Sequence, residues 1–310
     1  MSVGDCIVTV VGPTASGKSA LAVALARHLG AEIINADSMQ LYSGMDVGTA
    51  KPTEAERGGI RHHLFDVLQV TETATVAEFQ TWARDAVQDC VSRSVTPIVV
   101  GGSALYVRAV LDRLDFPGTD PAIRERWTAE LAARGAEALH AELAARDPAA
   151  AAQILPTNDR RIVRALEVIE LTGEPFVATM PAHDSVFDGL VMLGLDIPRD
   201  VLDARLVARV DQMWADGFVQ GVRALRENGL DQGLTAGRAL GYQQILGFLD
   251  GETTEDEARQ ATVVGTRKFA RRQDRLFRKD PRIHWLPYDA TDLVSTALEF
   301  IEARQQRRPE

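Results

Sequence analysis

A glycine-rich segment near the amino terminus has the residue types and the spacing of a phosphate-binding loop. Residues 12–19 read GPTASGKS and satisfy the pattern G-x-x-x-x-G-K-[ST]. In such a loop, glycines let backbone N–H groups turn inward around a phosphate, Lys18 supplies a compact positive charge, and Ser19 offers a hydroxyl to Mg²⁺. The residues predicted to bind phosphate are Gly12, Pro13, Thr14, Ala15, Ser16, Gly17, Lys18 and Ser19. The pattern does not identify which phosphate compound is held.

An acidic residue, Asp37, follows a strand pattern at Glu32–Asn35. At the end of that strand it would face the phosphate loop, where a carboxylate can hold a metal, orient a hydroxyl or take a proton from a nucleophile. NTP hydrolases of the switch or motor type normally place an acidic residue at the end of a further apolar strand. The candidate strand Pro97–Val100 is instead followed by the sequence GGS, which argues against an NTP hydrolase.

Arginine is concentrated in a segment near the carboxyl terminus. The helical pattern TRKFARRQDRLFRK at 266–279 places four arginines along one face, namely Arg267, Arg271, Arg275 and Arg278. Like charges this close repel each other unless an anion lies beside them, so this face is a candidate site for RNA phosphate or a leaving pyrophosphate. The same reasoning applies more weakly to Arg160, Arg161 and Arg164, whereas Arg238 lies at a helix start without an evident partner.

The first third of the chain alternates between buried strand patterns and helix patterns. This alternation implies an α/β fold that is P-loop NTPase-like, with a mainly parallel sheet and helices on both faces. Ligands of such sheets bind at the carboxyl ends of the strands, so residues 12–19, 37 and 101–103 should converge. Between residues 43 and 63, glycine and proline are too frequent for regular structure, which indicates a functional loop. The predicted elements are strands at Cys6–Val11, Glu32–Asn35 and Pro97–Val100, and helices that start at Lys18 and run over Val76–Val91.

After residue 118 the sequence becomes rich in alanine, arginine and glutamate and shows no strand pattern before Gly189–Ile197. This change predicts a helical insertion, residues 119–189, within a P-loop core made of residues 1–118 and 190–310. The clearest helix of the insertion begins at Asp159, after a polar capping pair, and ends at Gly173. Later helices are predicted near residues 199–228, 236–249 and 254–279.

Composition and charge narrow the class of protein further. With 45% hydrophobic and 25% charged residues, the chain has ordinary globular composition, and no apolar run reaches the ~20 residues that span a bilayer. The net charge is 34 − 44 = −10, which argues against a protein that coats nucleic acid through overall positive charge. Cys6 and Cys90 are the only cysteines and lack metal-ligand spacing. We therefore expect a cytoplasmic protein without a membrane partner, and we expect it to be a monomer.

Taken together, the motifs resemble one family, the tRNA dimethylallyltransferases, which attach a prenyl group to an adenosine beside the anticodon. They occur in the family's order and cover nearly the whole chain. Ser103 stands where the family usually has threonine after two glycines, and it keeps the hydroxyl. The zinc-finger extension of some eukaryotic members has no counterpart in these residues, which implies a bacterial-type enzyme. The segments that carry the resemblance are GPTASGKS at 12–19, NADSMQLYSGMDVGTAKP at 35–52, HHLFD at 62–66, PIVVGGSALY at 97–106, NDRRIVRALEV at 158–168 and RALGYQQ at 238–244.

The resemblance implies that the phosphate loop holds the diphosphate of dimethylallyl diphosphate rather than ATP, with Mg²⁺ bound at Ser19. It also implies that Asp37 is the general base and that Ser103 and Arg238 assist at the reacting centre. The anticodon stem-loop of tRNA would contact both the helical insertion and the residues that follow the second strand. The tRNA-binding residues implied in this way are Asp37, Ser38, Met39, Gln40, Arg160, Arg161, Ile162, Val163 and Arg164.

Prenyl transfer to the N6 amine of adenosine needs the chemistry that these residues offer. The lone pair of that amine is delocalised into the ring, so its attack on the prenyl C1 is easier if a carboxylate accepts a proton. Two alternatives stay open. Prenylation of free adenine nucleotides requires the same chemistry, and a small-molecule P-loop kinase would share the loop, Asp37 and an arginine-rich lid helix. A non-catalytic RNA-binding protein would not need the phosphate loop.

Overall fold

The computed structural model describes residues 6–176 and 183–306, which form two compact units. The first unit is built from the chain up to Asp112 and from Ser185 onward, and the second spans Arg113–Asp184. The boundaries predicted from the sequence, at residues 118 and 189, lie a few residues further along the chain. Residues 177–182 of the predicted insertion lie outside the described ranges.

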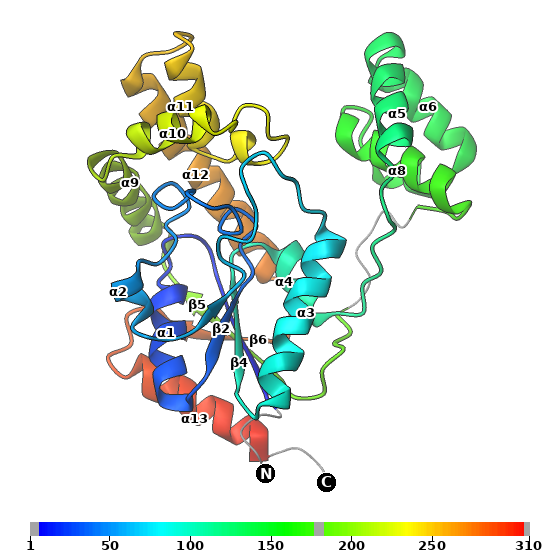
Figure 1. Cartoon of the computed structure of the whole chain (residues 1–310). Helices are drawn as coiled ribbons and strands as arrows, with labels where there is room; N and C mark the ends of the chain where they lie inside the picture. Colours follow the sequence, from blue (N-terminus) through cyan, green and yellow to red (C-terminus); the bar gives the residue numbers. More distant parts are fainter. Residues whose placement is uncertain (1–5, 177–182, 307–310) are drawn as a thin grey trace. The chain divides into compact units, whose positions relative to one another are not determined.

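The first unit contains a six-stranded sheet with the order β3-β2-β4-β1-β5-β6, in which all neighbouring strands are parallel (Figure 1). Strands of such sheets are apolar throughout because both faces are covered, and every residue of β1 and β4 is buried. The prediction of a P-loop NTPase-like fold with a mainly parallel sheet is confirmed. The strands are β1 (Ile7–Val11), β2 (Glu32–Asn35), β3 (His62–His63), β4 (Pro97–Gly101), β5 (Leu190–Asp196) and β6 (Ile283–Pro287).

Helices cover both faces of this sheet. The connection from β1 to β2 and the connection from β3 to β4 run in opposite directions across the sheet, so right-handed crossovers place their helices on opposite faces. On one face, Leu25 of α1 and Ile301 of α13 join Val10 and Val100 of the sheet in a single buried cluster. The helices concerned are α1 (Lys18–Leu29) and α13 (Leu293–Gln306) on that face and α3 (Val76–Ser92) and α4 (Ala104–Leu111) on the other (Figure 1).

Two glycines divide the long helices that the sequence predicts after β5. Gly217 and Gly241 have φ angles of 83° and 88°, a left-handed conformation that interrupts a helix. Among the described residues, no helix is long and apolar enough to span a bilayer. The stretch predicted to be irregular contains one short helix, α2 (Glu54–Arg57), together with β3. The later elements are α9 (Arg199–Ala215), α10 (Phe218–Glu227), the 3₁₀ turn η2 (Ala236–Arg238), α11 (Tyr242–Leu249) and α12 (Glu255–Phe277).

The second unit is helical and has a core of its own. Trp127, Leu139 and Leu166 are buried together at its centre. The helix predicted to begin at Asp159 is confirmed, and it ends at Gly173, whose φ of 71° provides the left-handed cap. The helices of this unit are α5 (Pro121–Arg134), α6 (Ala136–Arg146), α7 (Pro148–Gln153) and α8 (Asp159–Thr172).

Candidate active site

The phosphate loop connects β1 to α1, and two glycines determine its shape. Gly12 and Gly17 have φ angles of 150° and 102°, which glycine adopts more readily than other residues. A Cβ atom on Gly12 would also lie only 2.9 Å from the Ser16 Oγ. The loop therefore brings the N-terminus of α1, whose first N–H groups have no partner within the helix, to the carboxyl end of the sheet.

A cavity of about 630 Å³ lies beside this loop, and its volume is in the range of small-molecule sites. Its walls bring together residues from three regions that are distant in sequence. Asp37 and Gln40 come from the segment after β2, and Arg205 and Arg209 come from α9. Of the predicted phosphate-binding residues, Gly12, Pro13 and Ser16 are buried and do not line the cavity. The predicted residues that do line it are Thr14, Ala15, Gly17, Lys18 and Ser19.

Asn35 fixes the main chain of Asp37 at the cavity. Asn35 is 2% exposed, and its Oδ1 accepts the Asp37 N–H at 2.9 Å. Its Nδ2 donates to the carbonyl oxygens of Asp37 and Leu64, both at 3.0 Å. One oxygen of the Asp37 carboxylate, Oδ1, accepts the Met39 N–H at 3.0 Å. The second oxygen remains to accept a proton, so the arrangement suits a general base.

The charges around the cavity favour an anion. Burial, together with the nearby Arg209, lowers the pKa of Lys18 to about 8, and Asp37 partly offsets this effect. Burial also lowers the pKa of Arg209, while Asp37 and Glu56 act in the opposite direction. An anion bound between Lys18 and Arg209 would relieve their mutual repulsion.

Sequence reasoning missed Arg205 and Arg209. Both belong to a helix that the sequence does predict, and they are four residues apart, so they lie on the same helix face. That spacing was the available signal. It could be interpreted only once the middle of the helix was known to lie beside the phosphate loop.

We expect the affinity for pyrophosphate to fall as the pH rises above about 8, because the Lys18 ammonium of the ligand-free protein loses its proton there. A bound anion stabilises the protonated form, so binding is linked to proton uptake in this pH range. Calorimetric titration of Mg²⁺-pyrophosphate from about pH 7 to about pH 10 measures the effect. Lys18→Arg is the matched control, because arginine stays charged throughout and reports the titration of pyrophosphate itself. Parallel pH profiles for the two proteins would contradict the assignment of this pH dependence to Lys18.

Several residues to which the family resemblance gives a role in catalysis or in tRNA binding do not line the cavity. Ser103 is partly buried at the N-cap of α4, and Arg238 is exposed at the end of η2. Ser38 forms a hydrogen bond with Tyr106, whose pKa burial raises to about 12. Neither Ser38 nor Met39 is among the described residues that line the cavity.

A buried lysine stabilises the loop that follows β2 through hydrogen bonds. Lys51 is 6% exposed, and its ammonium donates to the Tyr42 carbonyl oxygen at 2.9 Å and to carboxylates of Asp46 and Asp66 at 2.7 and 2.5 Å. The side chain of Gln40 donates to carbonyl oxygens of the same loop, at residues 49 and 50. The loop that follows β2 is therefore held in one conformation, and Gln40 takes part in holding it.

The structure separates the residues of α8 that were implied to bind tRNA. Ile162 and Val163 are 0% and 6% exposed, so their side chains pack in the core of the second unit and not on its surface. Arg164 donates to Glu167 and to the carbonyl oxygens of residues 117 and 118. Of the three arginines, Arg160 and Arg161 are the exposed ones.

Glu167 explains why Arg164 is held in the second unit. This carboxylate is fully buried. Burial would raise its pKa, but hydrogen bonds from Thr119, Arg124 and Arg164 lower it below the ordinary value. Arg164 therefore compensates a buried charge, and its removal would destabilise the unit.

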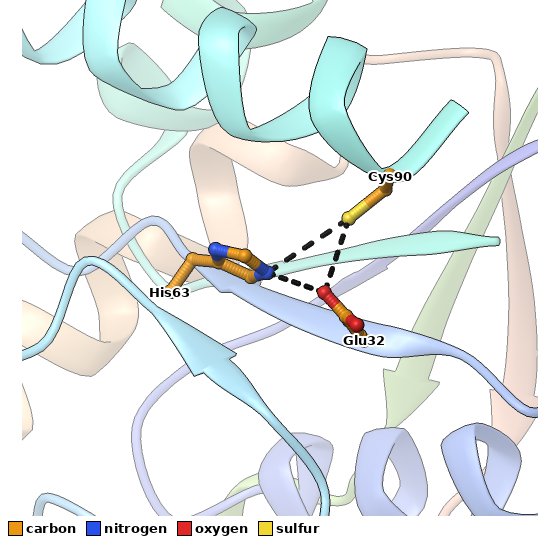
Figure 2. Close-up of side chains that lie close together, drawn as sticks. All are labelled: Glu32, His63 and Cys90. Carbon is orange, nitrogen blue, oxygen red and sulfur yellow. Dashed lines mark hydrogen bonds and ion pairs between the residues drawn. The ribbon is translucent and has the colours of Figure 1, made fainter. Parts of the chain in front are cut away.

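A second polar cluster lies at the amino end of β2. The Glu32 Oε2 is 2.7 Å from the His63 Nε2 and 3.6 Å from the Cys90 Sγ (Figure 2). These residue types can hold a metal. Arg93, however, donates to both Glu32 oxygens at 2.7 and 2.8 Å and lowers the pKa of Glu32 to about 2. Burial raises the pKa of Cys90 to about 11, which keeps the thiol protonated. The cluster is a closed hydrogen-bond network that joins α3 to β2 and β3.

Known proteins resemble this chain in sequence and in fold. The model of the family described as IPP transferase matches residues 40–280. A protein from Thermobifida fusca (strain YX), named tRNA dimethylallyltransferase, is 60% identical over 300 residues, which are 95% of this chain and 94% of that protein. The crystal structure of the full-length tRNA isopentenylpyrophosphate transferase from Bacillus halodurans is similar with a TM-score of 0.72 and 37% identity over 97% of both chains. A eukaryotic dimethylallyltransferase captured acting on tRNA has a TM-score of 0.84 and 25% identity, over 98% of this chain and 80% of that chain.

Proposed function

Because the chain belongs to the IPP transferase family, we propose that it transfers the dimethylallyl group of dimethylallyl diphosphate to the N6 amine of an adenosine beside the anticodon of tRNA. Pyrophosphate is the second product. The observation that carries the proposal is the cavity that the phosphate loop, Asp37 and Arg209 share. It combines a site for a diphosphate with a carboxylate that can accept a proton.

The diphosphate is held by the loop and by cations from two elements. The first N–H groups of α1 point toward the loop side of the cavity and attract an anion. Lys18 and Arg209 add full charges. Ser19 is exposed and lines the cavity, and its hydroxyl oxygen is a ligand type that Mg²⁺ accepts together with diphosphate oxygens. Mg²⁺ bound there would add positive charge beside the leaving group.

The reaction replaces one bond of the prenyl C1 by another. The N6 amine attacks C1 as the bond from C1 to the diphosphate oxygen breaks, and pyrophosphate leaves with the electron pair. Asp37 takes the proton that the amine loses. Lys18 and Arg209 stabilise the charge that develops on the leaving oxygen. The adenine must leave its stacked position in the anticodon loop to reach the cavity.

We further propose that the protein acts as a monomer in the cytoplasm. Its two cysteines are buried free thiols, as expected in a reducing compartment. Analytical ultracentrifugation tests the monomer, and a dimer at working concentration would contradict it.

Dimethylallyl diphosphate or pyrophosphate with Mg²⁺ is expected to raise the melting temperature more than ATP at equal concentration. A ligand that binds only the native state stabilises it by RT ln(1 + [L]/Kd), so the ligand with the lower Kd gives the larger shift. Thermal shift scans with each ligand measure this. A shift with ATP and none with dimethylallyl diphosphate would favour a kinase.

Replacing Arg160 and Arg161 by alanine is expected to weaken tRNA binding and to flatten its salt dependence. Each phosphate contact that is lost lowers the log-log slope by roughly 0.7 to 0.9. Filter binding over a series of salt concentrations measures both quantities. Arg223 and Arg304, exposed arginines of the first unit, give a control variant with the same change in net charge. Equal slopes for the two double variants would place the RNA away from α8.

A further inference from the structure

A buried glutamine of α12 contacts the phosphate loop, although 259 residues separate it from the loop residue that it binds. The Oε1 of Gln273 accepts the Thr14 N–H at 2.9 Å. Gln273 is 4% exposed, so the acceptor of this hydrogen bond is buried. The amide orientation follows from chemistry, because a backbone N–H requires an oxygen acceptor. Neither the phosphate-loop pattern nor the roles described above assign a function to this side chain.

The same amide lies against the loop that follows β4. A Cβ atom on Gly102 would be 2.5 Å from the Gln273 Nε2 and 3.4 Å from its Cδ. The strands β1 and β4 are neighbours in the sheet, so Gln273 fills the space between the loops that leave their carboxyl ends. The absence of a side chain at residue 102 is what makes that space available.

The position of Thr14 in the loop gives this contact a consequence for anion binding. Pro13 has no N–H, and its carbonyl oxygen accepts the Ser16 N–H at 3.3 Å. Gln273 binds the N–H of Thr14, the first of the two residues between them. The first half of the loop is thus fixed by contacts within the protein, while the N–H groups at the start of α1 remain for a ligand. A loop fixed in this way does not have to be ordered when the ligand binds, and this lowers the cost of binding.

We propose that Gln273 is a positioning residue for the diphosphate: by holding the Thr14 N–H, it fixes the phosphate loop in the conformation that binds the anion. The inference rests on the proposed function for the identity of the ligand. It assigns Gln273 no contact with the diphosphate itself. Its role is exerted through the loop.

Gln273→Met tests the hydrogen bond at nearly constant volume, because methionine fills a similar space without an acceptor for the Thr14 N–H. The loss of one buried hydrogen bond is expected to raise the Kd of Mg²⁺-pyrophosphate, and the KM for dimethylallyl diphosphate, by roughly tenfold. The Kd for tRNA and the single-turnover rate at saturating substrates should stay close to wild type. A purely structural role would lower the melting temperature and leave the pyrophosphate Kd unchanged, and that result would overturn the proposal.

A double-mutant cycle with Gly102 provides a second, independent test. Gly102 does not have a positive φ, so alanine is compatible with its backbone, and Gly102→Ala acts by displacing the Gln273 amide. Gly102→Ala is therefore expected to raise the pyrophosphate Kd in the wild type and to have little further effect in Gln273→Ala, where the Cβ has room. Additive effects would overturn the proposal. Because pyrophosphate binding is measured without tRNA, absence of binding to the wild-type protein would contradict the proposed function, whereas equal binding by wild type and Gln273→Met would contradict this inference alone.

Discussion

Asp37→Asn is expected to lower kcat by about 10²- to 10⁴-fold, the range for loss of a general base, with both substrates still bound. Asparagine keeps the shape of the side chain and an oxygen that can accept the Met39 N–H, but it cannot take the amine proton near neutral pH. The variant side chain stays beside the cavity because Asn35 holds the main chain of residue 37 on both sides. Single-turnover rates at saturating tRNA and dimethylallyl diphosphate separate the chemical step from binding.

The control for this variant is Asp200→Asn. Asp200 is exposed on the first turn of α9, so the substitution makes the same change in charge without reaching the cavity. Its single-turnover rate should equal that of the wild type. Near-normal chemistry in Asp37→Asn would mean that the proton leaves to water or to the departing pyrophosphate, and a rise in KM alone would make Asp37 a substrate or metal anchor.

The second large effect is expected from Arg209→Gln, which should lower kcat by about 10²- to 10³-fold, as for the loss of one preorganised group that stabilises developing charge. Arg209 is close enough to Lys18 and Asp37 to perturb the pKa of Lys18 and to be influenced by Asp37. Its charge therefore acts where the leaving diphosphate gains negative charge. The affinity for pyrophosphate should fall as well, because the product carries the charge that Arg209 stabilises.

Arg238→Gln is the matched comparison. The family resemblance implies that Arg238 assists the reaction, yet this residue is exposed on η2 and does not line the cavity. We therefore expect Arg238→Gln to change kcat and pyrophosphate affinity much less than Arg209→Gln does. If Arg238→Gln had the larger effect on pyrophosphate binding, the charge that meets the leaving group would come from η2.

The elements that could be predicted from sequence are those whose pattern is local. The strands β1 and β4 are nearly continuous apolar runs, the short strand β2 has two isoleucines at its centre, and α3 and α12 have strong helical spacing and capping boxes. The strand β6 escaped prediction because it lies at the edge of the sheet and is only partly buried. The helix α13, which buries Ala297 and Ile301, was not predicted either. Its apolar stripe is narrow and becomes evident only once it packs on α1.

The site was predictable to the extent that its residues lie in motifs. The phosphate loop and Asp37 carry their chemistry in local spacing, and the structure places both at one cavity. Arg209 and Gln273 act through contacts made by distant helices, and no local pattern shows which helix face meets the loop. For the segment from Arg160 to Arg164, the sequence showed the motif but not which of its residues are exposed. As a segment it resembles a tRNA-binding motif, but only burial distinguishes the exposed Arg160 and Arg161 from the core residues Ile162 and Val163.

The most direct test of the proposed function is transfer of labelled prenyl groups to competing acceptors. The protein is incubated with Mg²⁺, radiolabelled dimethylallyl diphosphate and either tRNA, AMP or ATP, and the Asp37→Asn variant serves as a control for catalysis. We predict that label enters tRNA alone, that nuclease digestion recovers it as N6-dimethylallyl adenosine from beside the anticodon, and that the variant transfers at least a hundredfold less in the same time. Label found in AMP or ATP with none in tRNA would contradict the account and identify an enzyme that prenylates free nucleotides.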